Sequence, residues 1–303
     1  MQSPGIVTFL TDFGWAGGYV AACEATMLRI LPDLRVLHIS HEVPNGDVGS
    51  AALVLARVAP LGPEAVHLAV VDPGVGTFRQ PLALSTARGD ILVGPDNGLL
   101  LPAADALGGV VAAWALDIDA VRRRAALPVG EVSNTFHGRD VFSPAAALLA
   151  TGRDPSALGT VLDPVSLARP AVPSPRRSKA GNGVEGDDLS GASDDDATGE
   201  AAVVIEVDRF GNVGLDRSFA ELRVPERSAP SFLVEILGEG APEWIAGVVR
   251  TYGDLAPGEL GLIRDSWGQA ALTLNGASAA ELLGLKIGAA LRLTPESEEA
   301  DGR

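Results

Sequence analysis

Acidic side chains follow three of the β-rich segments in the first half of this 303-residue chain. Asp12 ends one segment in LTDFG, Asp72 ends another in VVDPGVGTFR, and Asp96 with Asn97 follows a third in VGPDNGLL. In a parallel sheet, ligands bind just beyond the carboxyl ends of the strands. These positions therefore predict a ligand site, in which Asp12 either caps the following helix or accepts the hydroxyls of a ribose.

Arg79 follows Asp72 closely, and the glycines between them indicate a tight turn or a close approach of backbone to ligand. The spacing of these glycines fits neither a phosphate loop nor a dinucleotide fingerprint. On the surface, an ion pair between Asp72 and Arg79 would contribute little to stability. Inside a pocket, Arg79 would keep Asp72 ionised and oriented.

His137 lies in SNTFHGRD, directly before a glycine that permits an unusual backbone shape. A single histidine is more often a structural hydrogen-bonding residue than a catalyst. Here a dense polar group flanks it ahead of an apolar helix, so we treat it as a catalytic candidate. His38 and His67 fall inside expected strands and are interpreted as structural, and His41 at a strand end fits either role.

Composition narrows the classes of function. The formal net charge of -16 and the isoelectric point near 4.6 argue against a nucleic-acid partner, because such proteins neutralise phosphates with Lys and Arg. Cys23 is the only cysteine, which excludes an intramolecular disulfide and favours a reducing cytoplasm. Cys23 shares one face of an expected helix with apolar residues and is expected to pack there.

Neither secretion nor membrane insertion is predicted. The first residues, MQSPGIVTFLTD, carry no basic segment ahead of an apolar one, as a signal peptide would. The longest apolar run, 106–116, is about half of the roughly 20 residues that a membrane-spanning helix needs.

Short β-branched runs alternate with helical patterns before residue 170, which is typical of βαβ units on a parallel sheet. We expect strands at 6–12, 36–40, 65–72, 81–86, 91–93 and 110–116, and helices at 19–31, 47–59 and 141–150. After residue 200 the pattern is mostly strands, at 201–208, 231–237, 258–266, 269–276 and 289–294, with one short helix at 279–283.

Residues 170–200 are rich in Pro, Gly, Ser and acids and almost lack large apolar side chains, so we expect a flexible acidic linker. The predicted organisation is an N-terminal α/β domain at 1–169 and a smaller C-terminal domain at 201–303. The first is a mainly parallel, Rossmann-like sheet flanked by helices, and the second an antiparallel β-barrel.

The motifs, taken in order, resemble one family. TDFG, HEVPNGDV, VVDPGVGT with FR, GPDNGLL, TFHGRD, DRFGN, DSWG and NGASAAELLG are similar to those of the S-adenosyl-L-methionine (SAM) hydroxide adenosyltransferases. These SAM hydrolases are relatives of the bacterial fluorinases and chlorinases. The resemblance covers both expected domains and leaves out mainly the acidic linker.

The resemblance implies an activity and an assembly. Water displaces methionine from C5′ of the SAM ribose, giving adenosine and L-methionine, with SAM as substrate and no cofactor. It also implies a homotrimer whose SAM sites lie between the N-terminal domain of one subunit and the C-terminal domain of its neighbour.

Residue roles follow from the same resemblance. Asp72, Arg79 and His137 match a water-activating triad, and Asp12 matches a ribose-binding acid. The remaining expected substrate-binding residues are Asn97, Phe136 and Gly138 in the first domain and Asp208, Phe210, Asn212, Ser266, Trp267, Asn275 and Gly276 in the second. The residues that follow Asn212, Val213 to Asp216, depart from the family pattern.

Three alternatives stay open at this level. Halogenating relatives have tyrosine in place of Asp72, serine in place of Gly138, and a long insertion where this chain has a short link between Ala83 and Ile91. A sensor would bind SAM or adenosine in the same pocket without turnover. A metal-dependent hydrolase is third, although no HxH or HxxxH spacing supports a metal site, and none is expected.

Overall fold

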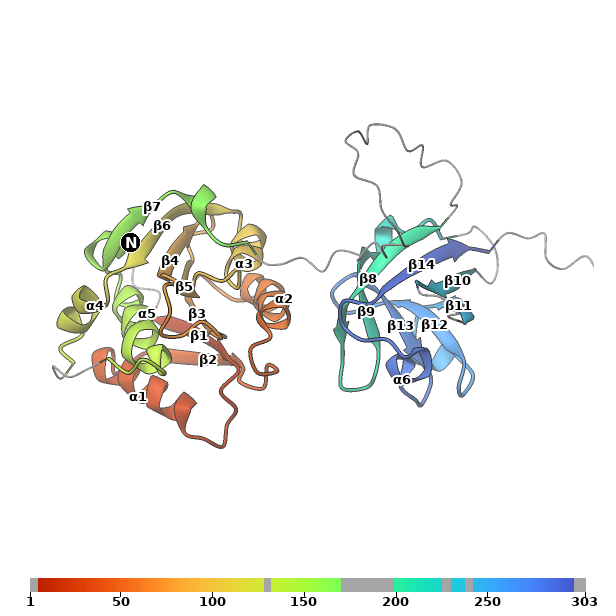
Figure 1. The fold of residues 1–303 in the computed structure, drawn as a ribbon, viewed down its shortest axis with the longest axis horizontal. Helices are drawn as coiled ribbons and strands as arrows, with labels where there is room; N and C mark the ends of the chain where they lie inside the picture. Colours follow the sequence, from red (N-terminus) through yellow and green to blue (C-terminus); the bar gives the residue numbers. More distant parts are fainter. Residues whose placement is uncertain (1–4, 128–131, 170–198, 225–229, 238–241, 297–303) are drawn as a thin grey trace, which may run out of the picture. The chain divides into compact units, whose positions relative to one another are not determined.

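The computed structural model describes residues 5–127, 132–169, 199–224, 230–237 and 242–296. The chain forms two compact units, Met1–Val172 and Pro173–Arg303 (Figure 1). The predicted linker lies outside the described residues except at its end, where Glu200 already begins a strand.

The first unit is built on a seven-stranded sheet with the order β2-β1-β3-β5-β4-β6-β7. The strands β2, β1, β3 and β5 are mutually parallel, and β4 is antiparallel to both β5 and β6. Because β7 is antiparallel to β6, only β4 and β7 oppose the other strands. The prediction of a mainly parallel sheet is confirmed. The strand bounds are β1 Ile6–Thr11, β2 Arg35–Ser40, β3 Val66–Val70, β4 Pro81–Thr86, β5 Ile91–Pro95, β6 Val110–Leu116 and β7 Gly159–Leu162.

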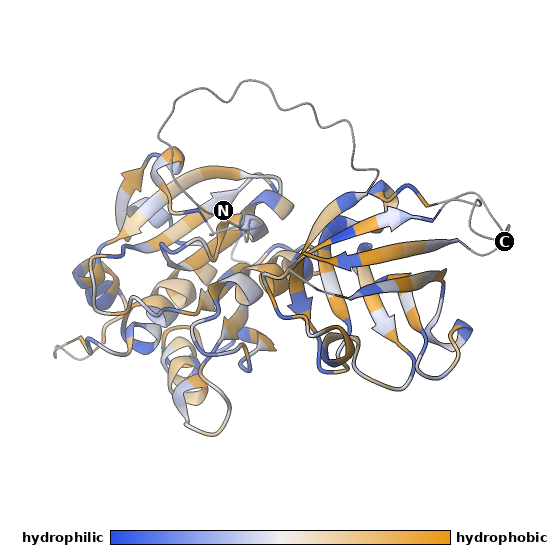
Figure 2. Ribbon diagram, turned by 45° about the vertical axis from the view of Figure 1, so that its right-hand side comes forward, coloured by the Kyte–Doolittle hydropathy of each residue, from blue (hydrophilic) through white to orange (hydrophobic). Residues whose placement is uncertain are grey.

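Helices cover both faces of this sheet (Figure 1). One face packs against α1 (Tyr19–Ile30), α4 (Ile118–Arg124) and α5 (Ser143–Ala150), and the other against α2 (Val48–Val58) and α3 (Leu101–Ala106). Neighbouring residues of β1 serve opposite faces, since Phe9 joins the first core and Leu10 the second. Burial on both faces explains why these strands read as hydrophobic runs (Figure 2).

The second unit is a closed barrel with the strand order β10-β11-β12-β13-β9-β8-β14. Its core collects inward-facing apolar residues from the strands and from α6 (Ala279–Leu283). The strands are β8 Glu200–Val207, β9 Val213–Ser218, β10 Ser231–Ile236, β11 Glu243–Val249, β12 Leu260–Arg264, β13 Gln269–Leu274 and β14 Ala290–Pro295.

One neighbouring pair in the barrel, β11 with β12, is parallel, whereas the others are antiparallel. A ring with an odd number of strands cannot alternate direction all the way round. Seven strands therefore require at least one parallel pair, and the predicted antiparallel barrel is found with this single exception.

The expected helices and strands are present, and most of their ends differ from the expected bounds by one or two residues. The first strand ends at Thr11, β3 ends at Val70 rather than Asp72, and the helix expected from residue 141 is preceded by a π-helical turn, Gly138–Phe142. Three strands, β7, β9 and β11, and two helices, α3 and α4, were not predicted. Within the described part of the chain, no helix combines the length and hydropathy that a membrane span needs.

Candidate active site

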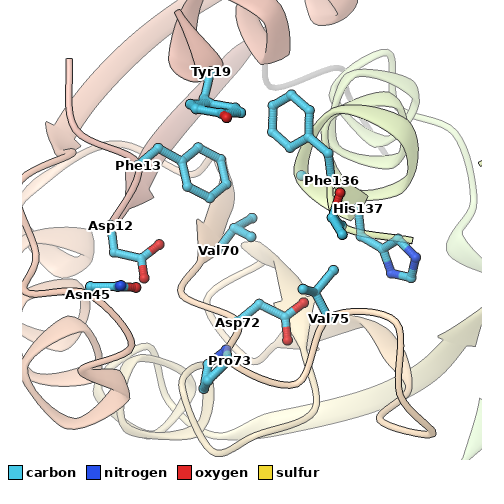
Figure 3. A pocket seen from close by; sticks show the side chains of 12 residues that line it. Asp12, Phe13, Tyr19, Asn45, Val70, Asp72, Pro73, Val75, Phe136 and His137 are labelled. Carbon is cyan, nitrogen blue, oxygen red and sulfur yellow. The ribbon is translucent and has the colours of Figure 1, made fainter. Parts of the chain in front are cut away.

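A cavity of about 350 Å³ opens in the first unit, just past the carboxyl ends of β1 and β3 (Figure 3). This is where the sequence placed a ligand site. It brings together the predicted residues Asp12, Asp72, Phe136, His137 and Gly138. The full lining is Asp12, Phe13, Tyr19, Asn45, Val70, Asp72, Pro73, Val75, Thr135, Phe136, His137 and Gly138.

Asp72, Arg79 and His137 meet in one hydrogen-bonded chain beside this cavity. Arg79 Nε lies 2.9 Å from both carboxylate oxygens of Asp72, and Arg79 Nη2 also donates to Asp72 Oδ2. The same Nη2 donates to His137 Nδ1 at 2.8 Å. The Arg79 and Asp72 side chains are only 9% and 6% exposed, so this is a buried ion pair rather than a surface one.

The loop from Asp72 to Arg79 is shaped by its glycines. Gly76 has φ of 77°, which side chains rarely adopt, and a Cβ there would lie 2.6 Å from the carbonyl oxygen of Asn134. The loop thus packs directly on the segment that carries His137. Of the two roles predicted for these glycines, the tight turn is found, with the Thr77 N–H donating to the Gly74 carbonyl at 3.1 Å, and the close approach at Gly76 is to Asn134.

Asn97 does not line the cavity. Its Nδ2 donates to the carbonyl of Val71 at 2.8 Å, and its Oδ1 accepts the backbone N–H of Leu99 at 3.2 Å. Its amide therefore fixes the backbone directly before Asp72 instead of facing a ligand. Asp96, the acid beside it, accepts the backbone N–H of Ala168 at 2.9 Å.

The environment of His137 fixes its protonation. Burial, followed by the nearby Arg79 guanidinium, holds the pKa of His137 below its ordinary value, although Asp72 and Asp140 oppose the shift. A neutral ring is also what the geometry requires, because Nδ1 accepts a hydrogen bond from Arg79. The remaining hydrogen then sits on Nε2, so His137 offers a donor there.

Asp140, which follows closely in sequence, serves the backbone. Its carboxylate accepts the N–H of Ser133 at 2.9 Å and pairs with Arg139. Burial alone would raise the pKa of Asp140, but the Arg139 and Ser133 hydrogen bonds lower it below its ordinary range. The Arg139 guanidinium lies 5.1 Å from the centre of the Phe136 ring, so the Arg139–Asp140 ion pair also contacts the residue that precedes His137.

Asp12 and a group of aromatic rings form the rest of the wall. The backbone N–H of Gly46 donates to Asp12 Oδ2 at 2.9 Å, and the carboxylate faces the cavity (Figure 3). Phe13, Tyr19 and Phe136 surround the neighbouring space at centroid distances of 5.1 to 6.3 Å. The alternative role of Asp12 as a helix cap is not found, since the N-cap position of α1 is Gly18 and no side-chain hydrogen bond caps the helix there.

The absence of a side chain at Gly138 allows the Phe13 ring to pack directly against the backbone there. A Cβ at this position would lie 2.9 Å from Phe13 Cζ and 3.4 Å from Phe136 Cε2. A larger residue at position 138 therefore requires a shift of the Phe13 ring or of the backbone beside it.

The second unit has a larger cavity of about 720 Å³. It contains six of the seven residues predicted there, whereas Trp267 is outside the lining. The lining is Asp208, Phe210, Asn212, Tyr252, Ser266, Thr273, Leu274, Asn275, Gly276, Ala277 and Ser278.

Asp208 and Asn212 are joined to each other by several hydrogen bonds. Asp208 accepts from the backbone of Phe210 and Asn212 and from Asn212 Nδ2, and Asn212 Oδ1 accepts the Thr273 hydroxyl at 2.6 Å. Phe210 is 74% exposed at the mouth. The loop is thus a rigid turn that presents an exposed aromatic ring.

Sequence reasoning missed several lining residues, among them Phe13, Tyr19, Asn45 and Tyr252. Phe13 and Asn45 stand inside the motifs TDFG and HEVPNGDV, so their place beside Asp12 was a usable signal. Tyr19 and Tyr252 have no comparable local pattern.

The other histidines and Cys23 are buried or partly buried. His67 binds Thr8 and Asp90 within the core, as expected of a structural residue. Burial raises the pKa of the Cys23 thiol to about 12, in keeping with its expected packing role. Among the described residues, no group of three or more His, Cys, Asp or Glu side chains is arranged to hold a metal ion.

Comparison with known proteins gives matches along both units. The family model for the SAM hydroxide adenosyltransferase N-terminal domain matches residues 7–159, and the model for the C-terminal domain of that family matches 202–292. The chain is 45% identical to the (R)-S-adenosyl-L-methionine hydrolase of Salinispora tropica, over 95% of this chain and 97% of the relative.

A solved structure of a conserved protein from Thermotoga maritima is also similar. It has a TM-score of 0.75 and 30% sequence identity, over 95% of this chain and 99% of that one. A fluorinase of Nocardia brasiliensis matches at 31% identity over only 84 residues, which are 27% of this chain and 28% of the fluorinase.

Proposed function

Because this chain belongs to the SAM hydroxide adenosyltransferase family, we propose that Asp72, Arg79 and His137 direct a water molecule at C5′ of SAM. The enzyme hydrolyses SAM to adenosine and L-methionine. The observation that supports the residue assignment is the continuous hydrogen-bonded contact of these three side chains, two of which, Asp72 and His137, line the cavity.

The substrate itself explains why so little acid catalysis is needed. Sulfur in SAM is a positively charged sulfonium, and the C5′–S electron pair leaves on methionine as a neutral thioether. The protein must therefore align a water molecule opposite the sulfur and accept the proton that the water loses. Moving the substrate from bulk water into the cavity should also help, because charge disperses in this reaction.

We assign proton acceptance to Asp72 and orientation to His137. His137 Nδ1 is occupied by Arg79, so its Nε2–H donates to the water oxygen instead of removing a proton. Of the Asp72 oxygens, Oδ2 accepts two contacts from Arg79, whereas Oδ1 accepts only that from Nε and retains lone-pair capacity. As the O–C5′ bond forms, one water proton passes to Asp72.

Substrate binding is proposed to use both units. In the first, Asp12 accepts ribose hydroxyls while Phe13 and Phe136 contact the adenosyl moiety. In the second, the residues around Phe210, Ser266 and Asn275 bind adenine and methionine, in a homotrimer that joins cavities of neighbouring subunits. The net charge of -16 attracts a cationic substrate. We place the enzyme in the cytoplasm, with no cofactor and no nucleic-acid partner.

Two features oppose halogenation. The carboxylates of Asp12 and Asp72 would repel a halide in the same cavity. The link between β4 and β5 is a short hairpin, in which Gly89 N–H donates to Thr86 O at 3.0 Å, and it holds no insertion.

One experiment tests the activity. The purified full chain is incubated with SAM, with and without added chloride or fluoride, and products are separated by chromatography. Adenosine and methionine in equal amounts, independent of halide, are expected. A halogenated adenosine would show a halogenase, and binding of SAM without products would show a sensor.

A further inference from the structure

His41 holds the turn that carries Asp12 at two points. Its backbone carbonyl accepts the N–H of Gly14 at 2.8 Å, and its Nδ1 lies 2.8 Å from the hydroxyl of Thr11. Asp12 and Phe13, which both line the cavity, lie between these two anchors. His41 and Thr11 are completely buried, so water does not compete for either bond.

The direction of these hydrogen bonds can be worked out. Thr11 Oγ1 accepts the backbone N–H of Phe13 at 3.2 Å, and its own buried hydrogen needs an acceptor, so we assign that hydrogen to His41 Nδ1, which lies 2.8 Å away. The hydrogen of His41 then sits on Nε2 and is donated to His38 Nδ1 at 2.8 Å. Burial, and then His38, lower the pKa of His41 to about 4, which agrees with this neutral form.

Two neighbours support the imidazole pair from outside. The Trp15 ring packs edge-on against His41 at 4.6 Å and lies 5.3 Å from His38. His38 Nε2 is 3.6 Å from the carboxylate of Glu24 on α1. The chain of contacts thus runs from the partly exposed surface of α1 to the backbone N–H of Phe13.

We propose that His41 is a positioning residue, which acts through Thr11 to fix the turn that presents Asp12 to the ribose of the substrate. This inference rests on the proposed function only for the role of Asp12. His41 itself touches no substrate. Its loss is expected to weaken adenosyl binding and to leave the chemical step, carried by Asp72, much less affected.

Thr11→Val is the central variant, because it removes the hydroxyl and keeps the side-chain shape. Thr11→Ser keeps the hydroxyl and should rescue binding. The chain also offers a matched control in the same strand: Thr8 makes an equivalent buried bond of 2.8 Å to a histidine, His67, away from the cavity. Thr8→Val therefore reports the structural cost of losing such a bond.

Adenosine affinity of the full chain is measured by calorimetry, and KM and kcat for SAM by product release. For Thr11→Val we expect Kd and KM to rise about tenfold with kcat within about threefold, and for Thr11→Ser and Thr8→Val both constants to stay within about twofold. Equal affinities for Thr11→Val and wild type, or equal losses in Thr8→Val, overturn the proposal.

A second pair of variants covers a failure of Thr11→Val to fold. His41→Asn keeps an acceptor near the position of Nδ1, whereas His41→Ala removes it, so only the alanine variant should lose adenosine affinity. Equal affinity in the two overturns the proposal. If wild type binds adenosine but cannot cleave SAM, the proposed function fails while these affinities still decide the role of His41. If wild type cleaves SAM but does not bind adenosine measurably, the proposed function stands and the KM values of the same variants decide the role of His41.

Discussion

Replacing Asp72 with asparagine removes the negative charge beside the attacking water and preserves the size of the side chain. In the wild type, the Asp72 carboxylate accepts three contacts from Arg79. An asparagine has only one acceptor oxygen, and its NH2 group would face a donor nitrogen of Arg79. Hydrogen bonds to charged groups contribute about 1.5–3 kcal/mol each, so we expect the free energy of unfolding to fall by about 2–3 kcal/mol.

The effect on turnover should be larger than the effect on stability. A positioned proton acceptor contributes about 10²- to 10⁴-fold, which is about 2.7–5.4 kcal/mol of barrier at 1.36 kcal/mol per tenfold. The guanidinium of Arg79 is also left without its counter-charge beside a cationic substrate. We therefore expect kcat to fall at least a hundredfold and KM for SAM to rise.

The assay follows adenosine release at saturating SAM, and thermal unfolding checks that the variant is folded. Asp163→Asn is a matched control, because it makes the same change of charge at an exposed residue of the same unit that caps a short helix. It should leave kcat unchanged. A folded Asp72→Asn enzyme with more than a tenth of wild-type turnover would refute the assignment of Asp72 as proton acceptor.

Substitutions at His137, Gly138 and His41 test three other contacts in and around the site. His137→Gln can still donate from its amide where Nε2–H stands, so it should retain at least tenfold more turnover than His137→Ala; equal rates would contradict the donor role. Gly138→Ala places a Cβ against Phe13, so KM for SAM should rise about threefold to tenfold and the melting temperature should fall, and an unchanged KM would show that the ring moves freely. His41 has its pKa lowered by burial from 6.5 to about 4, so the unfolded chain binds more protons between these pH values, and the free energy of unfolding should fall as the pH drops through that window. At 1.36 kcal/mol per pH unit the fall attributable to His41 is about 3 kcal/mol, measured as the difference between wild type and His41→Asn in denaturant titrations at pH 7 and pH 4; a difference that does not change with pH would refute it.

Local patterns were sufficient for the elements with strong periodicity. The segments that became β1, β3 and β4 are buried on both faces, so their apolar runs are long and easy to read. The strands β9 and β11 escaped prediction because Gly interrupts the apolar residues of both, and VGLDRS also contains Asp and Arg. Their hydrogen bonds come from neighbours in the barrel, which no local pattern reports.

For the candidate site, the sequence by itself determined which groups stand at strand ends, because a parallel sheet brings those ends to one edge. Asp12 and Asp72 both line the cavity at that edge. Only the tertiary structure decided that His137 gives its Nδ1 to Arg79, that the amide of Asn97 serves the backbone, and that His41 reaches Thr11. Hydrogen bonds of this kind join residues that are far apart in the chain and form only when two atoms come within about 3 Å of each other. Residue types and their spacing in the sequence do not determine such distances.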